Sequence, residues 1–256
     1  MNDAKLRFSN RVQDYIRYRP TYPVELLRVL ETDAELTTAA IVADVGSGTG
    51  LSSKLFLDHG NTVYGVEPNR EMREAAEKLL GSNSHFHSVN ATAEQTTLDH
   101  GSVDYIVCGQ AFHWFDRSKT RQEFARILRP GGWVVLVWNA RRIGTTEFLC
   151  DYEGLLRELA IDYRQVDHKL VDDSVIGEFF APAKYQFRSL ENSQLLDLAG
   201  LTGRIASSSY MPAEGHPLYP VMLPAIEKLF ERNEQGGRVK IEYDTVLYFG
   251  QLTSTD

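Results

Sequence analysis

Three glycines stand at alternate positions after a short apolar segment, in the sequence VADVGSGTGLS of residues 42–52. A glycine-rich turn between a buried strand and a helix exposes backbone N–H groups, which bind the anionic parts of nucleotide-like ligands. The spacing of Gly46, Gly48 and Gly50 is G-x-G-x-G. The dinucleotide fingerprint is G-x-G-x-x-G, and its third glycine would fall at Leu51. The turn predicts a nucleotide-like ligand and disfavours a dinucleotide.

An acidic residue, Asp44, precedes the first glycine by two positions. A carboxylate there would repel the pyrophosphate of a dinucleotide and attract a cationic ligand. S-adenosylmethionine carries a sulfonium, an ammonium and a carboxylate. The N–H groups of the turn, including that of Ser47, suit its carboxylate, and Asp44 suits its positive groups. These residues therefore favour S-adenosylmethionine as the ligand, with S-adenosylhomocysteine as the product of its use.

A second acidic residue, Glu67, ends the apolar segment TVYGVE. It falls about 20 residues after the first glycine, where an acid commonly binds ribose hydroxyls. A ribose diol offers two donors to one carboxylate, so the pairing is bidentate. The alternative is an acid at the start of a helix, stabilised there by the helix dipole. Together with Asp44 and the glycines, the ribose interpretation is favoured, and Pro68 is assigned to the same site.

The residues around these motifs predict the elements that position them. Near-continuous apolar strands alternate with helices, which indicates an α/β fold with a parallel sheet covered on both faces. Ligands of such sheets bind outside the carboxyl ends of the strands. The predicted strands are 40–45, 62–67, 85–91, 103–109 and 133–138, and the predicted helices are 51–59, 70–80 and 117–128.

The flanking segments lack this alternation. Before the core we predict an amphipathic helix within residues 1–20 and a second helix capped by Thr21, with Pro23 in its first turn. After Asn139 the predicted helices are within 145–182 and at 193–209 and 223–232, and the predicted strands are 184–190 and 239–252, the latter antiparallel. We thus expect an N-terminal helical lid (1–37), a coenzyme-binding core (38–140), and lid helices with C-terminal strands completing the same domain (141–256).

Four motifs, in their order along the chain, resemble a class I S-adenosylmethionine-dependent methyltransferase. They are D-x-G-S-G-T-G from Asp44, GVEPN, SVDYIVCGQAFHWF and ILRPGGW. The resemblance covers roughly residues 40–140. It implies a Rossmann-like, doubly wound, mostly parallel sheet with an antiparallel edge strand and helical lid insertions.

The third strand carries a departure from that family's pattern. The family's Asp, which contacts the adenine amino group, is replaced here by Thr92 in the sequence ATAE. The contact is then weaker or passes to backbone groups. By the same resemblance Thr92, Ala93 and Gln110 are assigned to the donor site.

Outer motifs resemble a small-molecule subgroup that includes trans-aconitate methyltransferase-like proteins. These motifs are YRPTYP, QAFHWFD, WN and SSSYMP. His113 follows the fourth strand and is a candidate general base, or else it packs against the donor or caps the sheet. Trp114 beside it is interpreted as an apolar wall of the acceptor site.

Further candidates for acceptor binding lie in the outer segments. Each has a structural alternative, namely helix packing for the N-terminal residues, a solvated loop for Arg141 or Arg142, and a core position for Tyr210. An arginine after the fifth strand could pair a substrate carboxylate bidentately. The candidates are Tyr15, Arg19, Tyr22, Asn139, Arg142 and Tyr210.

The composition of the chain indicates which classes of binding partner are disfavoured. The net charge is −8 and no block of basic residues occurs, which disfavours a nucleic-acid partner. The basic residues of the first thirty positions form either a solvated helix face or an anion-facing lid. Two cysteines give no disulfide framework, and the HFH sequence is interpreted as surface packing, with no metal site. No apolar segment approaches the roughly 20 residues that span a bilayer, and no signal peptide is seen.

These observations predict a cytoplasmic S-adenosylmethionine-dependent methyltransferase with a small-molecule acceptor, a carboxylate or another heteroatom, and no membrane partner. Three alternatives remain. A nicotinamide-dependent oxidoreductase would require the missing third glycine. A protein that binds the donor without transferring methyl would fit Thr92 and the uncertain general base. A protein methyltransferase would fit the acidic charge. The oligomeric state is left open.

Overall fold

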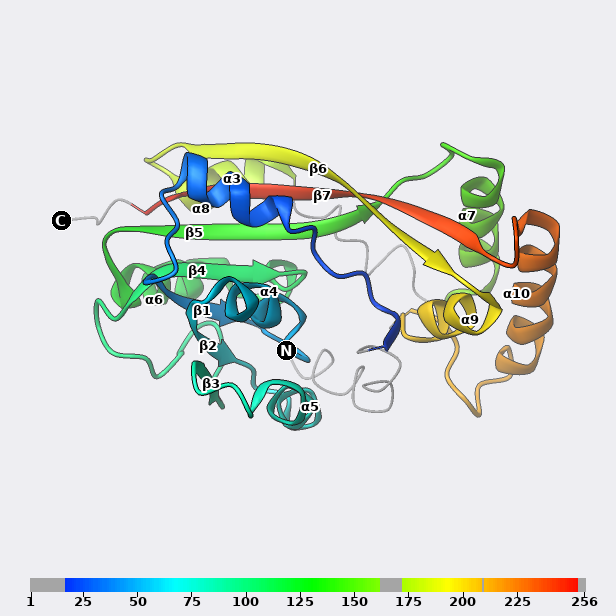
Figure 1. Cartoon of the computed structure of the whole chain (residues 1–256), viewed down its shortest axis with the longest axis horizontal. Coiled ribbons are helices and arrows are strands. Elements are labelled where there is room, and N and C mark those ends of the chain that lie inside the picture. Colours follow the sequence, from blue (N-terminus) through cyan, green and yellow to red (C-terminus); the bar gives the residue numbers. More distant parts are fainter. Residues whose placement is uncertain (1–16, 162–171, 209, 253–256) are drawn as a thin grey trace.

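The computed structural model describes residues 17–161, 172–208 and 210–252, and its centre is a seven-stranded sheet (Figure 1). The strands lie in the order β3-β2-β1-β4-β5-β7-β6. Strands β1 to β5 pair in parallel, and β7 pairs antiparallel with both β5 and β6. This confirms the predicted α/β class and antiparallel edge. The strands are β1 (Ile41–Val45), β2 (Thr62–Val66), β3 (Phe86–Val89), β4 (Val103–Gly109), β5 (Leu128–Arg141), β6 (Tyr185–Leu196) and β7 (Val239–Gln251).

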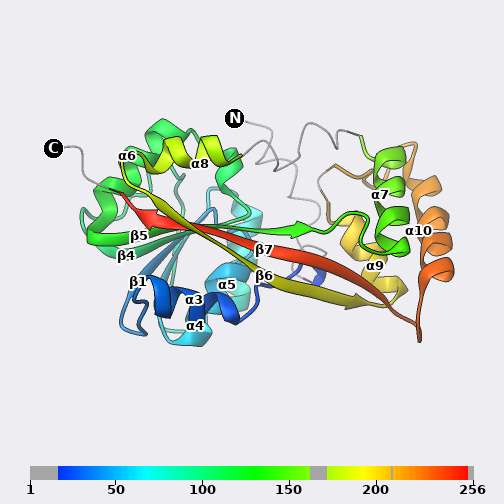
Figure 2. The same cartoon turned by 90° about the horizontal axis from the view of Figure 1, so that it is seen from above.

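Helices cover both faces of this sheet (Figure 2). Side chains of α3 and α4 pack on one face, and side chains of α6 and α8 pack on the other. The helices are α3 (Glu25–Asp33), α4 (Leu51–His59), α5 (Arg70–Leu80), α6 (Arg117–Ile127), α7 (Glu147–Leu159), α8 (Asp173–Phe180), α9 (Leu198–Ala206) and α10 (Tyr219–Asn233), with the 3₁₀ turn η2 (Phe112–Trp114). The doubly wound arrangement predicted from the resemblance is therefore present.

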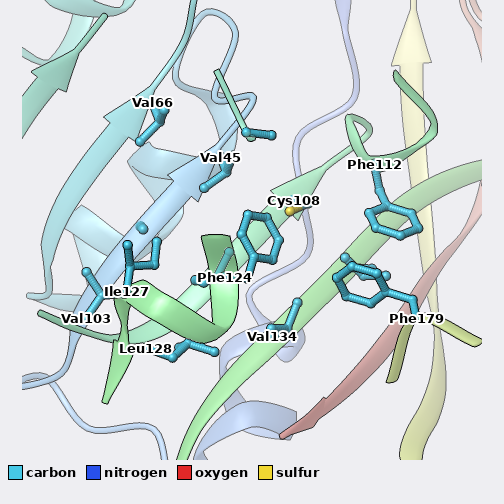
Figure 3. Close-up of a cluster of buried hydrophobic side chains, with 14 of the residues drawn as sticks. Val45, Val66, Val103, Cys108, Phe112, Phe124, Ile127, Leu128, Val134 and Phe179 are labelled. Carbon is cyan, nitrogen blue, oxygen red and sulfur yellow. The ribbon is translucent and has the colours of Figure 1, made fainter. Parts of the chain in front are cut away.

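The central strands are mainly apolar because both of their faces are buried, and Asp44 of β1 is an exception. In β5, Val134 and Leu136 pack with the side chains of α6 and α8, whereas Val135 and Val137 pack with those of α3 and α4. Figure 3 shows the first of these cores, in which Phe124 of α6 lies over the sheet. All five side chains are at most 1% exposed. The core therefore fixes the strands whose carboxyl ends carry the predicted site.

A third core lies beyond the parallel sheet, in a unit that we call the helical lobe, formed by α7, α9, α10 and the adjoining ends of β6 and β7 (Figures 1 and 2). Strands β6 and β7 have 12 and 13 residues, against 5 in β1, so they extend past the sheet. Their extended ends contribute Leu196, Ile241 and Tyr243 to the lobe, where α10 contributes Met222 and Ile226. The lobe lies on the side that the carboxyl ends of the parallel strands face.

Before the core, the structure tests only part of the prediction, and it differs at Thr21. Residues 1–16 lie outside the described residues, and so does Tyr15. Thr21 does not cap a helix, because α3 begins at Glu25 after Val24, without a side-chain cap. The carbonyl of Thr21 instead accepts hydrogen bonds from the side-chain amides of Asn139 and Asn192. These long-range bonds hold the segment non-helical.

Three element boundaries in the second half also differ. Strand β5 begins at Leu128, five residues before the predicted start at 133, and its pairing with β4 jumps from Leu128 to Trp133. The predicted helix 193–209 is wrong in its first turn, because β6 continues to Leu196 along its whole pairing with β7. Helix α9 then begins after Asp197, whose side chain accepts a hydrogen bond from the N–H of Gly200. Helix α10 begins at Tyr219, four residues before the predicted start.

Some general features of the described ranges bear on function. None of their helices combines the length and the apolar character needed to cross a bilayer. They contain no group of three or more His, Cys, Asp or Glu side chains that could hold a metal ion. Cys108 is buried in the sheet and Cys150 is exposed on α7, and neither forms a disulfide.

The core predicts a specific loss of stability. Phe124→Ala should lower the free energy of unfolding by about 3–5 kcal/mol, because it opens a cavity beneath α6. Leu79→Ala on α5, where the side chain is 40% exposed, should change it by less than about 1 kcal/mol. Urea unfolding of both variants checks this. Equal losses in the two variants would contradict the assignment of Phe124 to the core.

Candidate functional site

The glycine turn lies at the carboxyl end of β1, between this strand and α4. Gly46, Gly48 and Gly50 have φ values of 72°, 56° and 85°. This left-handed region is open to glycine and costly for other residues. The N–H groups of Gly46 and Ser47 donate to the carbonyl of Val66 at 2.9 and 3.2 Å. The turn is thereby fixed to the end of β2.

The three glycines differ in what surrounds them. A Cβ on Gly46 would lie 2.6 Å from the Cβ of Ala111, and a Cβ on Gly50 would lie 2.6 Å from Cδ1 of Leu80. Both positions are glycine because neighbouring elements approach closely. A Cβ on Gly48 would meet no atom within 4 Å. Gly48 therefore borders open space at the top of the turn.

Glu67 follows β2 and reaches across to the glycine turn. Its Oε2 accepts a hydrogen bond from the N–H of Gly48 at 2.9 Å, and its Oε1 accepts one from the N–H of Asn69 at 2.7 Å. Burial raises the pKa of Glu67, these two hydrogen bonds oppose the rise, and the charge of Asp44 adds to it. A carboxylate has about four lone-pair sites, so each oxygen keeps capacity to accept a further hydrogen bond.

Asp44 is fully buried at the end of β1. Its Oδ2 accepts hydrogen bonds from the hydroxyls of Ser52 and Ser53 at 2.7 and 2.6 Å. Its Oδ1 is buried and has no hydrogen-bond partner among the described residues. Burial raises the pKa of Asp44 to about 6, although the serine hydrogen bonds act in the opposite direction. One oxygen of this carboxylate is thus available to a ligand.

The remaining predicted donor residues lie around the same edge. Pro68 and Thr92 are partly buried after β2 and β3, and the carbonyl of Thr92 accepts a hydrogen bond from the N–H of Gln95. Ala93 is 5% exposed and packs in the core shown in Figure 3. Gln110 follows β4 with a φ of 57°, which is unusual for a residue with a side chain.

The turn η2 presents His113 and Trp114 directly after β4. Phe112 fixes it, because its ring packs against that of Phe179 with 4.7 Å between the centroids (Figure 3). The rings of His113 and Trp114 lie 4.9 Å apart, with Trp114 37% exposed and His113 half-buried. The role of His113 as general base and that of Trp114 as an apolar wall stay predictions.

Asn139 joins three parts of the chain. Its Oδ1 accepts hydrogen bonds from Thr245 and Asn192, and its Nδ2 lies 3.4 and 3.3 Å from the carbonyls of Pro20 and Thr21. Its carbonyl accepts a hydrogen bond from the side chain of Gln110 at 3.4 Å. Asn139 therefore orders the segment that enters the sheet before α3, and its predicted contact with an acceptor stays a prediction.

The predicted basic and tyrosine residues are dispersed. Arg142 is bound by two protein carboxylates, with Nη2 at 2.8 Å from Asp244 and 3.2 Å from Glu191. Arg19 donates to the carbonyl of Ser207 at 2.9 Å, so it joins the N-terminal segment to α9. Tyr210 packs against the helical lobe. Arg142 could bind a substrate only in exchange for these partners.

Tyr22 lies closer to the donor edge. Its hydroxyl is 2.6 Å from where a Cβ on Gly109 would stand, and Ser52 Oγ is 3.1 Å from the same point. The hydroxyl thus borders the end of β4 and the serine that holds Asp44. Any side chain at position 109 would displace it.

The prediction missed several residues that hold the site. Ser52 and Ser53 fix Asp44, and Asn69 caps α5 by accepting a hydrogen bond from the N–H of Met72 while its own N–H binds Glu67. An Asn directly before a helix is a recognised N-cap, so this pattern could have identified Asn69. Thr245 acts on Asn139 from 106 residues away, and no local pattern reveals it.

Comparisons with known proteins relate the central part of the chain to methyltransferases. The family model for a methyltransferase domain matches residues 43–136, from β1 into β5. An uncharacterized methyltransferase of Mycobacterium tuberculosis is 38% identical over 154 residues, which are 59% of this chain and 60% of that protein. The chain thus spans 60% of the length of this relative. The segment 43–136 therefore resembles a methyltransferase domain.

Two further similarities extend over nearly the whole chain. An uncharacterized methyltransferase of Schizosaccharomyces pombe is 28% identical over 246 residues, covering 94% of this chain and 95% of that protein. The solved structure of a candidate type II methyltransferase from Anaeromyxobacter dehalogenans has a TM-score of 0.67 at 22% identity, covering 92% and 98% of the two chains. This structure shows a shared fold. The trans-aconitate methyltransferase-like subgroup stays a prediction.

The raised pKa of Asp44 makes the stability of the protein depend on pH. The folded state holds a proton on Asp44 between the ordinary pKa of 3.8 and about 6, so stability falls as pH rises through this window. The Asp44→Asn variant has no ionisable group at this position, so its stability does not fall in this pH window. From pH 4 to pH 7, its free energy of unfolding should gain roughly 2 kcal/mol relative to wild type.

Urea unfolding of both proteins at the two pH values measures this difference. Asp58→Asn, at a side chain that is 63% exposed, is the control and should follow wild type. A difference between Asp44→Asn and wild type that stays constant with pH would contradict the buried carboxylate.

The glycine turn predicts unequal effects of two matched substitutions. Gly46→Ala and Gly48→Ala each force a side chain into the left-handed region, at a cost of about 1–2 kcal/mol. Gly46→Ala also drives its Cβ into Ala111, so it should lose about 1–3 kcal/mol more. Thermal or urea unfolding of the two variants tests this order, and equal stability would refute it.

Proposed function

We propose that this protein is an S-adenosylmethionine-dependent methyltransferase that acts on a small-molecule acceptor in the cytoplasm. The observation that carries the proposal is the junction of the glycine turn with Glu67, where Oε2 of the carboxylate holds the N–H of Gly48 at 2.9 Å. The methyltransferase domain matched over residues 43–136 contains this junction. The net charge of −8 supports a small acceptor over a nucleic acid.

The residues present fit this donor in three ways. Gly48 borders open space, so a bound molecule can approach the backbone of the turn. Glu67 retains lone pairs for the two hydroxyls of a ribose. Asp44 Oδ1 is a buried acceptor without a partner among the described residues, which suits an ammonium group. Thr92, at the predicted adenine position, is only partly buried.

Methyl transfer places modest chemical demands on this chain. When bound, the donor supplies a methyl group on a sulfonium, which is already an excellent leaving group. The protein therefore has to align the two reactants and exclude water. Glu67 and the glycine turn hold the donor side, and Asp44 supplies negative charge beside it. His113 follows β4, and its proposed role is to accept a proton from a hydroxyl or amine acceptor.

Calorimetric titration with S-adenosylmethionine and S-adenosylhomocysteine tests the donor. Wild type should bind both compounds, and Glu67→Ala should weaken binding by about 30-fold or more, because two ribose hydroxyls lose a charged acceptor. The substitution also leaves the N–H groups of Gly48 and Asn69 without their acceptor, which lowers stability. A control variant with a similar loss of stability is therefore needed.

Glu123→Ala provides that control. Glu123 is 8% exposed and also accepts a backbone N–H, from Thr96, but it belongs to α6 and its hydrogen bonds join it to Thr96 and Arg126 rather than to the glycine turn. This variant should lose stability and keep its affinity for both compounds. Binding that is equally weak in the two variants would show a loss of folding, and no binding to wild type would overturn the proposed donor.

A further inference from the structure

Arg204 is a buried guanidinium in the helical lobe, and no carboxylate pairs with it among the described residues. It lies on α9 and is 6% exposed. Its Nε donates to the hydroxyl of Tyr243 at 3.2 Å, and its Nη1 donates to Ser208 Oγ at 3.1 Å. Arg141, which also belongs to this part of the molecule, differs because it forms an ion pair with Glu153. Among the described residues, the positive charge of Arg204 is therefore not compensated by a carboxylate.

A second and independent feature is the hydroxyl of Tyr152 on α7. It is fully buried, and no hydrogen-bond partner lies within reach in the part of the chain that the structure describes. The guanidinium of Arg141 lies 4.7 Å from the centre of its ring. Burial raises the pKa of Tyr152 to about 12, so the hydroxyl is neutral and can donate. Arg141 lies opposite Tyr243 in the pairing of β5 with β7, and Arg204 binds the Tyr243 hydroxyl, so the two features occupy the same part of the lobe.

These two groups are costly to a protein that has no use for them. A buried charge without a partner and a buried hydroxyl without a hydrogen bond both oppose folding. A guanidinium has five N–H donors, and hydrogen bonds to protein acceptors account for two of those on Arg204. An anion beside Tyr152 would accept from both groups and compensate the charge.

Hydrogen bonds connect this cluster to the donor edge. The hydroxyl of Tyr243 donates to Gln194 Oε1 at 2.9 Å, and Gln194 Nε2 donates to the carbonyl of Tyr18 at 3.1 Å. The segment from Tyr18 continues to Thr21, whose carbonyl lies 3.3 Å from Nδ2 of Asn139 at the end of β5. In Figures 1 and 2, α9 lies between the parallel sheet and α10. Helix α9, which carries Arg204, thus lies on the side of the lobe nearest the sheet.

We propose that Arg204 and Tyr152 bind a carboxylate of the methyl acceptor, which makes the substrate class a small carboxylic acid. This inference rests on the proposed function, because it concerns the acceptor of the same reaction. A carboxylate is a planar monoanion that the guanidinium fork binds bidentately, and it matches the single charge of Arg204. A phosphate monoester carries close to two charges. Arg204 and Tyr152 act here as binding residues that orient the acceptor.

The experiment measures thermal midpoints with acetate, butyrate, hexanoate and benzoate, each against its primary amide, at constant ionic strength. At least one carboxylate should raise the midpoint of wild type, and its amide should not. Arg204→Met should remove this rise while its own midpoint without ligand equals or exceeds that of wild type. Tyr152→Phe should fold normally and bind the carboxylate about tenfold more weakly.

Controls separate this inference from the proposed function. Arg232→Met, at an arginine whose side chain is 65% exposed on α10, should respond to carboxylates as wild type does. S-adenosylhomocysteine should bind all four proteins with equal affinity in calorimetry. If wild type fails to bind it while Arg204-dependent carboxylate shifts persist, the proposed donor is wrong and the anion site stands.

Three results would overturn the inference. One is the absence of a shift with every carboxylate, and another is a shift that survives Arg204→Met. The third is a larger Arg204-dependent shift with inorganic phosphate, which would assign the site to a phosphoryl group. Should Arg204→Met not fold, Tyr152→Phe carries the test, because unchanged carboxylate affinity in that variant contradicts the site.

Discussion

The antiparallel pairing of β5 with β7 is the constraint on which both halves of the molecule depend. It runs from Trp133 opposite Gln251 to Arg141 opposite Tyr243. Its first part lies in the parallel sheet and its last part carries the helical lobe (Figure 1). A slip of one residue would turn every side chain of β7 to the other face. Tyr243 would then leave Arg204, so the register sets the geometry of the proposed acceptor side.

The donor edge depends on a different balance, between burial and hydrogen bonding at two carboxylates. Glu67 and Asp44 end neighbouring strands, and burial raises the pKa of each. Backbone N–H groups bind both oxygens of Glu67, whereas serine hydroxyls bind only Oδ2 of Asp44. Glu67 thereby fixes the turn in place even before a ligand binds. The second oxygen of Asp44 has no hydrogen-bond partner among the described residues.

The core and the donor motifs could be predicted from sequence because local patterns specify them. Short apolar strands and glycines at helix ends, such as Gly60 after α4, give boundaries within a residue or two. The errors arise where long-range contacts decide. Thr21 is held by Asn139 and Asn192, and β6 is lengthened by its pairing with β7. The burial of Arg204 depends on the same pairing, so a charged residue in a helical pattern gave no indication of it.

Two buried carboxylates of this chain, Glu123 and Asp44, differ in how completely hydrogen bonds satisfy them. Glu123 of α6 is as buried as Glu67, and Thr96 and Arg126 bind it. Burial acts to raise its pKa, yet hydrogen bonds from Arg126 and Thr96 hold that pKa below its usual value. The chain can therefore compensate a buried carboxylate fully where only stability is required. That it leaves Asp44 Oδ1 without such a partner among the described residues supports a ligand as the missing one.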